Sequence, residues 1–310
     1  MVSEIAKLYG ISIDNNNYKS AFAELLKKLS EIDQVIILID EYDKPLIDFL
    51  ENIEQSNKNR EILKTFYSTI KGCEEYLKFV FITGVSKFSQ TSLFSDLNNL
   101  NDITINDKYN GICGYKKEDI KNHFKDYIKE LAVEYNKKSN SIFEDIKIWY
   151  DGYSWNSKEF IYNPFSVLNL FETKTFSNYW FKSGSPTFLL KLIRKKNYDL
   201  TKVEKIEVTD DTFDKYNIEN ISIIALLFQT GYLTIKKRKK STQGTLYTLD
   251  YPNLEVKKSL LEHLISEYSG ATNGEKSILI NRLRDNLINK EFDEFIETLK
   301  SLFAGLVYET

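Results

Sequence analysis

The sequence is poor in the residues that build disulfide-linked or zinc-held frameworks. It has two cysteines among 310 residues, and these, Cys73 and Cys113, lie far apart in the chain. Such spacing excludes a CxxC zinc knuckle and argues against the disulfide framework of a small secreted domain. The two histidines, His123 and His263, are also widely separated, so a histidine-based zinc site would lack ligands. We therefore expect neither a structural zinc nor a disulfide framework.

Long apolar runs and a strong net charge are absent as well. The longest apolar runs, such as Val35–Ile39, have only five or six residues, far fewer than the roughly 20 that span a bilayer. The chain does not open with a basic segment followed by an apolar one, as a secretory signal would. A net charge of −3 demands neither a nucleic acid nor an anionic membrane as partner. We expect a cytoplasmic protein that does not bind membranes.

Helical and strand-like patterns alternate in the first third of the chain. Residues 18–31 and 57–77 have apolar side chains at helical spacing, and each segment is followed by a short apolar run. These runs, 35–40 and 79–83, are typical of strands that are covered on both faces. A third strand is expected over 102–105. Alternation of helices with buried strands predicts an α/β layer structure with a parallel sheet.

From about residue 116 helical periodicity dominates. Helices are expected over residues 116–136, 141–150, 164–172, 186–196, 219–229, 253–268, 275–288 and 291–303. A β-hairpin interrupts them, with strands over 231–235 and 245–251 and a polar turn that ends in Gly244. Helices combined with a hairpin resemble a winged-helix or mixed helical subdomain. We place the domain boundary near residue 115, between an α/β core over 1–115 and a mostly helical region over 116–310.

Two acids, Asp40 and Glu41, directly follow the first apolar run. A buried strand would fix them at its carboxyl end, where the ligands of open α/β sheets bind. In phosphoryl transfer the first acid can hold Mg²⁺, and the second can orient the attacking water. Neighbouring strand residues point to opposite faces, so the strand must end here, and Tyr42 and Pro45 fit that ending. An ordinary buried strand that leaves into an acidic turn would produce the same short pattern.

Longer motifs accompany the two acids. They are IDEYDKPL (39–46), VFITGVSKFSQTSLFSDLNNLNDIT (80–104), YNGICGY (109–115), WYDGYSW (149–155), YNPFSVLNLF (162–171), NYWFKSGSPTFLL (178–190) and FQTGYLTI (228–235). Together they resemble the AAA-ATPase-like family of bacterial proteins, in which an ATPase core is often followed by a PD-(D/E)XK nuclease-like domain. The resemblance extends over nearly the whole chain. It implies a P-loop ATPase core that hydrolyses ATP with Mg²⁺ as a conformational switch.

The same resemblance implies roles for individual residues. Asp40 and Glu41 become the Walker B pair, with Asp40 as the metal ligand and Glu41 as a catalytic residue. Asp43 completes the DEYD motif and supports the bound Mg²⁺ and nucleotide. Thr83 takes the place of a sensor-1 residue, which hydrogen-bonds the attacking water or the γ-phosphate, and Lys87 stands where a cation could face phosphate. From the residues alone, Thr83 could instead be an ordinary strand end and Lys87 a solvated loop charge.

The P-loop that such an ATPase uses is not in this sequence. In GxxxxGK[ST], backbone N–H groups cradle the phosphates and the lysine contacts them. None of the 12 glycines heads such a motif, and the segment 84–87 (GVSK) has the wrong spacing. The family carries its P-loop well upstream of the Walker B strand, so the chain resembles a member that begins late. We expect weak binding of ATP and Mg²⁺, and association or poor solubility because a partial sheet leaves an edge and an apolar face open.

Three other features each allow a functional and a structural interpretation. The basic run Lys236–Lys240 could touch nucleic-acid phosphate, or it could keep a hairpin turn soluble. The aromatic residues of WYDGYSW could stack on bases or belong to the core. Glu255-Val256-Lys257 is the one candidate for the nuclease motif, but it opens an amphipathic segment. Two hypotheses stay open: an ATPase core incomplete at both ends, or a non-enzymatic module that binds itself, another protein or nucleic acid.

Overall fold

The chain is represented by a computed structural model, which divides into two compact units. The residues it describes are 2–14, 17–49, 52–85, 100–180, 187–196, 198–199, 203–214, 222–269 and 273–304. The first unit comprises residues 1–109, 206–233 and 237–249. The second comprises residues 110–205, 234–236 and 250–310.

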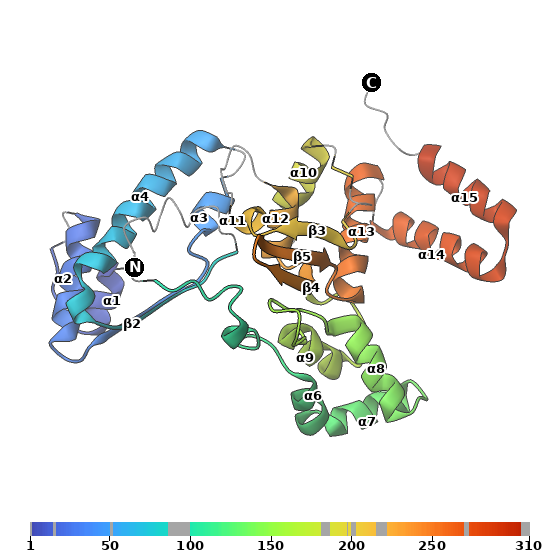
Figure 1. The fold of residues 1–310 in the computed structure, drawn as a ribbon, viewed down its shortest axis with the longest axis horizontal. Helices are drawn as coiled ribbons and strands as arrows, with labels where there is room; N and C mark the ends of the chain where they lie inside the picture. The colour runs from blue at the N-terminus through green and yellow to red at the C-terminus, as the bar shows by residue number, and fades with distance from the viewer. Residues whose placement is uncertain are drawn as a thin grey trace. The chain divides into compact units, whose positions relative to one another are not determined.

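The first unit begins with an α/β layer (Figure 1). Its elements are α1 (Val2–Leu8), α2 (Tyr18–Ser30), β1 (Val35–Ile39), α3 (Lys44–Ile47), α4 (Ile53–Gly72), η1 (Glu74–Tyr76), β2 (Leu77–Ile82) and η2 (Asp107–Tyr109). β1 and β2 pair in parallel, with Ile36 opposite Phe79 and Ile39 opposite Ile82. The predicted α/β order with parallel strands is confirmed, in the form of a small two-stranded sheet.

The core of this layer lies between the sheet and the two long helices. One cluster of buried side chains joins Phe22 and Leu26 of α2, Ile37 of β1, and Tyr67 and Ile70 of α4. Apolar residues at helical spacing in α2 and α4 give each helix one face that can meet the sheet. Because side chains alternate along a strand, only every second residue of β1 enters this core.

The third predicted strand, over residues 102–105, is wrong. The Thr104 N–H donates to Asp102 Oδ1 at 2.9 Å, and the Asn106 N–H donates to the Ile103 carbonyl at 3.2 Å. These are turn contacts rather than strand pairing. The Asp102 carboxylate offers the backbone a local acceptor, which competes with a partner strand.

Three strands and two short helices occur later in the chain. They are β3 (Ile206–Thr209), α11 (Asp211–Asp214), α12 (Ile223–Gln229), β4 (Thr234–Ser241) and β5 (Gly244–Asp250). The strand order is β3-β5-β4, with β3 antiparallel to β5. The predicted hairpin exists, but the basic run Lys236–Lys240 lies inside β4 and not in the turn. An edge strand can carry consecutive charged residues because it has no partner on one side, and such charges discourage edge-to-edge association.

The second unit is mostly helical (Figure 1). Its helices are α6 (Lys117–His123), α7 (Lys125–Glu134), α8 (Ser139–Tyr150), α9 (Pro164–Thr173), α10 (Thr187–Lys195), α13 (Leu254–Ser269), α14 (Asn273–Asn289) and α15 (Phe292–Ala304). With α12, every predicted helical segment contains a helix, and the segment 116–136 is divided at Phe124. No helix in the described ranges combines the length and the apolar character that crossing a membrane requires.

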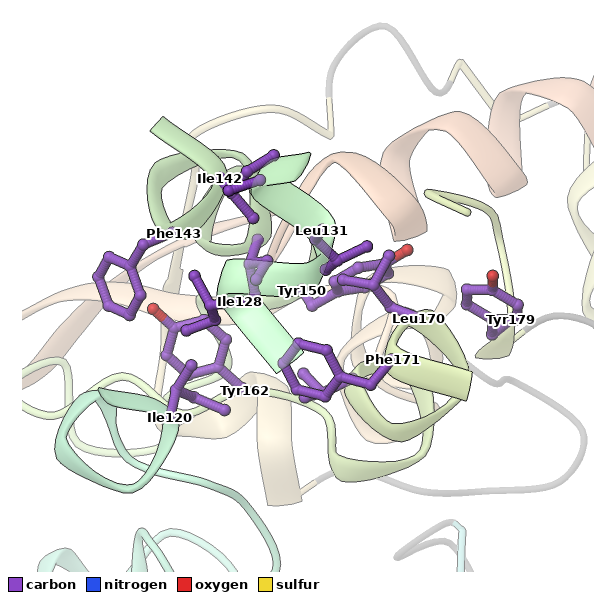
Figure 2. Close-up of a cluster of buried hydrophobic side chains, with 13 residues drawn as sticks. Ile120, Ile128, Leu131, Ile142, Phe143, Tyr150, Tyr162, Leu170, Phe171 and Tyr179 are labelled. Carbon is purple, nitrogen blue, oxygen red and sulfur yellow. The ribbon is translucent and has the colours of Figure 1, made fainter. Parts of the chain in front are cut away.

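A buried cluster of aliphatic and aromatic side chains holds α6 to α9 together (Figure 2). Tyr150, the last residue of α8, is fully buried in it. Its hydroxyl donates to the Ser177 carbonyl and accepts from the Ser177 N–H, both at 3.1 Å. Trp149 packs against the same cluster. Part of the WYDGYSW motif is therefore core, as the structural interpretation predicted.

Gly152 allows the chain to turn closely past another segment of the second unit. Its φ is +116°, and a Cβ at this position would overlap the carbonyl oxygen of Pro252. We expect Gly152→Ala to lower the free energy of unfolding by about 2–5 kcal/mol, because backbone strain and overpacking add. Urea unfolding followed by circular dichroism measures the change.

Gly72→Ala is the matched control for this substitution. Gly72 ends α4, and a Cβ there would meet nothing within 4 Å. Alanine at this helical position should leave stability unchanged or raise it by up to about 1 kcal/mol. Equal stabilities of the two variants would refute the close approach at Gly152.

Candidate functional site

Asp40 and Thr83 meet at the carboxyl ends of β1 and β2. The register pairs Ile39 with Ile82, so the residues that follow in each strand are neighbours. The Thr83 N–H donates to the Ile39 carbonyl at 2.8 Å, and the Tyr42 N–H donates to the Thr83 carbonyl at 2.9 Å. These bonds continue the pairing past the strands, and the Thr83 hydroxyl donates to Asp40 Oδ1. The structure thus brings together two residues that the sequence predicts for one site.

The two carboxylate oxygens of Asp40 have different surroundings. Oδ1 accepts from the Thr83 hydroxyl and from the Glu41 N–H, the latter at 3.0 Å. Oδ2 has no hydrogen bond or ion pair with any described residue, and the side chain is exposed. An exposed carboxylate oxygen is a ligand that Mg²⁺ accepts. Within the described ranges no three acidic, histidine or cysteine side chains gather into a metal-binding group.

Glu41 is an exposed residue with left-handed backbone. Its φ is 51°, a conformation that costs a non-glycine residue about 1–2 kcal/mol. Its carbonyl accepts from the Lys44 N–H at 3.0 Å, which closes a turn before α3. The strand therefore ends at the two acids, as their proposed joint use requires. Local strain of this kind is found at functional sites, where the surrounding structure holds it in place.

Asp43 is fully buried and stabilises the turn itself. Its Oδ1 accepts from the Val85 N–H at 3.1 Å, which ties the segment after β1 to the segment after β2. A Cβ on Gly84 would lie 2.7 Å from that oxygen and would overlap the ring of Tyr42, so only glycine fits. Burial, and then the negative charge of Asp43, raises the pKa of Tyr67 to about 12. Asp43 holds the site in shape from within.

Of the residues around the candidate site, Lys87 was predicted but lies outside the described part of the chain, and Gly84 was not predicted. Lys87 lies outside the described residues, so its contact with phosphate stays a prediction. Sequence reasoning did not anticipate the part played by Gly84, whose missing side chain lets Tyr42 and Asp43 approach β2. The signal was a glycine directly after the strand-ending Thr83. A glycine at such a point often marks a close backbone approach.

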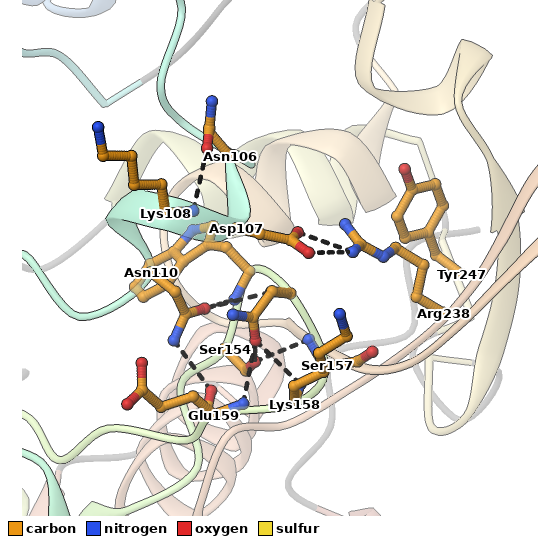
Figure 3. Close-up of polar contacts among 12 residues, drawn as sticks. Asn106, Asp107, Lys108, Asn110, Ser154, Ser157, Lys158, Glu159, Arg238 and Tyr247 are labelled. Atoms are coloured by element: carbon orange, nitrogen blue, oxygen red, sulfur yellow. Dashed lines mark hydrogen bonds and ion pairs between the residues drawn. The ribbon is translucent and has the colours of Figure 1, made fainter.

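The basic run of β4 is partly occupied by structural contacts. Lys236 Nζ donates to the carbonyls of Gly152 at 3.3 Å and Pro252 at 2.8 Å, and burial lowers its pKa. Arg238, 9% exposed, pairs with Asp107 at 2.7 Å (Figure 3). The other three lysines of the run are exposed. The run therefore offers fewer free cations to nucleic-acid phosphate than its sequence suggests.

The YNGICGY and WYDGYSW motifs meet through Asn110 (Figure 3). Asn110 Oδ1 accepts from the N–H groups of Trp155 at 2.7 Å and Asn156 at 3.2 Å. Its Nδ2 donates to the Glu159 carbonyl at 3.0 Å, and Glu159 also forms an ion pair with Lys116 at 2.8 Å. The Asn110 side chain therefore joins the two motifs by hydrogen bonds to backbone groups, which is a structural role.

Glu255-Val256-Lys257, the candidate nuclease motif, lies at the start of α13. Glu255 is fully buried, whereas Lys257 Nζ forms an ion pair with Glu204 at 2.7 Å near the surface. A nuclease of this class needs the acid and the lysine at one metal site. The observed helix agrees with the amphipathic interpretation, and the two side chains do not share an environment.

Comparison with known proteins places the N-terminal part of the chain in a family. Residues 1–94 match the family model described as a predicted AAA-ATPase, AAA-ATPase-like. The chain is 38% identical over 261 residues to an uncharacterized protein in the vnfD 5′ region of Azotobacter chroococcum mcd 1. That match covers 84% of this chain and 48% of the relative, so the chain spans about half the relative's length. No solved structure matches significantly. The region that carries β1, β2, Asp40, Glu41 and Thr83 is therefore the part of the chain that matches the AAA-ATPase-like family model.

Proposed function

We propose that the ends of β1 and β2 form the metal- and water-facing half of a site for Mg²⁺-dependent ATP hydrolysis. The observation that carries this proposal is the bond from Thr83 to Asp40 Oδ1, which leaves Oδ2 of an exposed carboxylate without a described partner. Asp40 would hold Mg²⁺, Glu41 would orient the attacking water, and Thr83 would position Asp40 and sense the reacting phosphate. Bound Mg²⁺ would neutralise charge on the phosphate oxygens.

This half site alone should bind nucleotide weakly. No GxxxxGK[ST] motif occurs in the sequence, and Lys87 is the remaining candidate for a cation near phosphate. Most contacts to a triphosphate in this class come from the P-loop backbone and the helix behind it. We therefore propose that the chain by itself neither binds ATP tightly nor hydrolyses it, and that the ATPase reaction requires phosphate contacts from elsewhere.

We expect Asp40→Asn to weaken the binding of Mn²⁺, used as a paramagnetic substitute for Mg²⁺. Losing one charge near a divalent cation should cost about 2 kcal/mol, or about thirtyfold in affinity. Asp48→Asn is the matched control, because Asp48 is an exposed acid that pairs with Lys44 at 3.2 Å, just past α3. Electron paramagnetic resonance of free Mn²⁺ measures both variants. An affinity that is unchanged by Asp40→Asn would refute the metal site.

Calorimetric titration of the same proteins with MgATP separates the two parts of the proposal. We expect no isotherm of micromolar affinity in the wild-type chain. If the wild-type chain binds MgATP with micromolar affinity and Asp40→Asn weakens this binding, the proposed site is supported. The proposal that the chain lacks sufficient phosphate contacts is then refuted. Micromolar binding that is insensitive to Asp40→Asn would place the nucleotide elsewhere.

A second candidate function, interaction without catalysis, is favoured by the uncovered face of the parallel sheet. Ile36, Leu38 and Phe79 are 54%, 71% and 54% exposed, and we call these residues the open face. Ile36 lies opposite Phe79 in the register, so the three side chains form one apolar surface. Parallel sheets usually have both faces covered. With a net charge of only −3 to oppose association, we infer that two copies of the chain cover each other's open face.

Leu38→Glu is expected to shift the chain from a self-associated species to monomer. Burying one leucine on association is worth about 1.5–3 kcal/mol, and a charge there would have to be desolvated. Val133→Glu is the control, because Val133 is 83% exposed on α7 of the second unit and is not part of the open face. Sedimentation velocity over a range of concentrations reports the association state. A wild-type chain that stays monomeric, or equal effects of both variants, would contradict the inference.

We also propose, because helices combined with a β-hairpin resemble one, that the helices and the hairpin form a winged-helix-like region. The three exposed lysines of β4 would be its contact to nucleic acid. Lys236 and Arg238 are held by other contacts, which supports protein association over nucleic-acid binding. A cytoplasmic location is consistent with both candidate functions.

A further inference from the structure

Glu255 is a fully buried acid that three parts of the second unit share. It is the second residue of α13, and its side chain is 0% exposed. Its Oε1 accepts from the Ser166 hydroxyl of α9 at 2.9 Å and from the Trp180 N–H at 3.0 Å. Asn178 makes a second link from the same segment to α13, because its Nδ2 donates to Glu262 Oε2 at 3.0 Å. The segment 178–180 is therefore attached to α13 at two points.

The two oxygens of Glu255 are used unequally. Oε1 receives two described donors, whereas Oε2 is buried without any hydrogen-bond partner. An ionised carboxylate would share its charge between both oxygens and leave one of them unsolvated. A neutral acid has the observed asymmetry, with Oε1 as a carbonyl that accepts twice and Oε2 as a hydroxyl.

A hydroxyl on Oε2 needs an acceptor, and α13 supplies one. Ser259 lies one turn further along the same helix face, and its Oγ is buried without a partner. Donation from Glu255 to Ser259 would satisfy both orphaned atoms at once. An orphaned buried polar atom is costly, so pairing the two is favourable.

No described cation compensates a charge at Glu255. On α13, Lys257 pairs with Glu204, and Lys258 lies 3.8 Å from Glu262 and over the Trp149 ring. The other titratable groups that interact with Glu255 are Tyr150 and Tyr153 of the neighbouring segments, and Tyr179 contacts it through its backbone. Burial raises the pKa of Glu255, while hydrogen bonds from Trp180, Ser166 and Tyr179 lower it by less.

We infer that Glu255 is a proton-binding site of the second unit, and that loss of this proton releases the segment 178–180 from α13. The folded unit takes up the proton on Oε2, and Ser259 Oγ is its proposed acceptor. When the proton leaves to solvent, the hydrogen bonds to Oε1 strengthen, but the charge on the buried, unpartnered Oε2 is costly, and separating α13 from Trp180 lets water solvate it. The site makes the attachment of this segment dependent on pH.

The direction of the pH effect follows from the raised pKa. Because the folded chain holds the proton more tightly than the unfolded chain, this contribution to stability is complete below the ordinary pKa of glutamate. It is lost as pH rises from that value through the raised pKa of Glu255 in the fold. A single such group changes the folding equilibrium constant by up to about tenfold per pH unit inside this window.

The test compares the wild-type chain with Glu255→Gln and Glu134→Gln. Glutamine keeps the shape and carries no titrating proton, and Glu134 is an exposed acid on α7 that serves as the matched control. We expect wild type and Glu134→Gln to lose stability as pH rises through the window, and Glu255→Gln to lose this dependence. The Trp180 amide resonance should titrate in wild type and not in Glu255→Gln.

Opposite results would overturn the inference. A wild-type stability that rises with pH, together with a Glu255→Gln chain that is less stable at every pH, would mean that Glu255 is ionised. If Glu255→Gln does not fold, Ser259→Ala keeps the acid and removes its proposed acceptor. We expect that variant to shift the Trp180 titration to lower pH, because the neutral acid loses its hydrogen bond. An unchanged midpoint in Ser259→Ala would refute the donation to Ser259.

Discussion

The parallel register of β1 and β2 is the constraint on which the candidate site depends. Because Ile39 lies opposite Ile82, the next residues, Asp40 and Thr83, are placed side by side although 43 positions separate them. The hydrogen bonds of Tyr42 and Thr83 extend this pairing past the last strand residues. A slip of one strand by one residue would turn its side chain to the opposite face and separate Asp40 from Thr83. The core between the sheet, α2 and α4 therefore also fixes the geometry of the acids.

Within this frame the three acids of the DEYD motif have separate tasks. Asp43 is buried and holds the turn through Val85, whereas Asp40 and Glu41 are exposed. A buried carboxylate is tolerated when it is hydrogen-bonded, and Gly84 provides the room for that contact. The left-handed backbone of Glu41 ends the strand between Asp40 and Asp43. A sequence motif of four residues thus contains both a supporting acid and two acids that are open to a ligand.

Much of the fold could be predicted from local pattern, and the failures have physical causes. The apolar run 35–39 and the helical spacing of α2 and α4 specify their structures because each buries one continuous face. The strand predicted over residues 102–105 does not form, because the Asp102 side chain takes the place of a partner strand as hydrogen-bond acceptor. The prediction that the basic run Lys236–Lys240 forms the hairpin turn was wrong, because an edge strand need not show apolar alternation.

Side-chain environments created by distant contacts could not be predicted at all. Arg238 pairs with Asp107, 131 positions away, and Glu255 is buried by α9 and by the segment 178–180. The local sequence indicates neither contact. There, Arg238 belongs to a basic run and Glu255 to an acid-x-lysine pattern. For the candidate site, the sequence identified Asp40, Glu41 and Thr83, but not that Gly84 is needed to bring their segments together.

Magnitudes limit what the acids can do by themselves. Two unit charges 4 Å apart in water attract each other by about 1 kcal/mol, while micromolar affinity corresponds to about 8 kcal/mol. Asp40 is exposed, so its attraction for a cation lies near the lower of these figures. Under the proposed function, the acids would therefore orient a metal-bound nucleotide, and the energy that holds it would have to come from contacts with the phosphates.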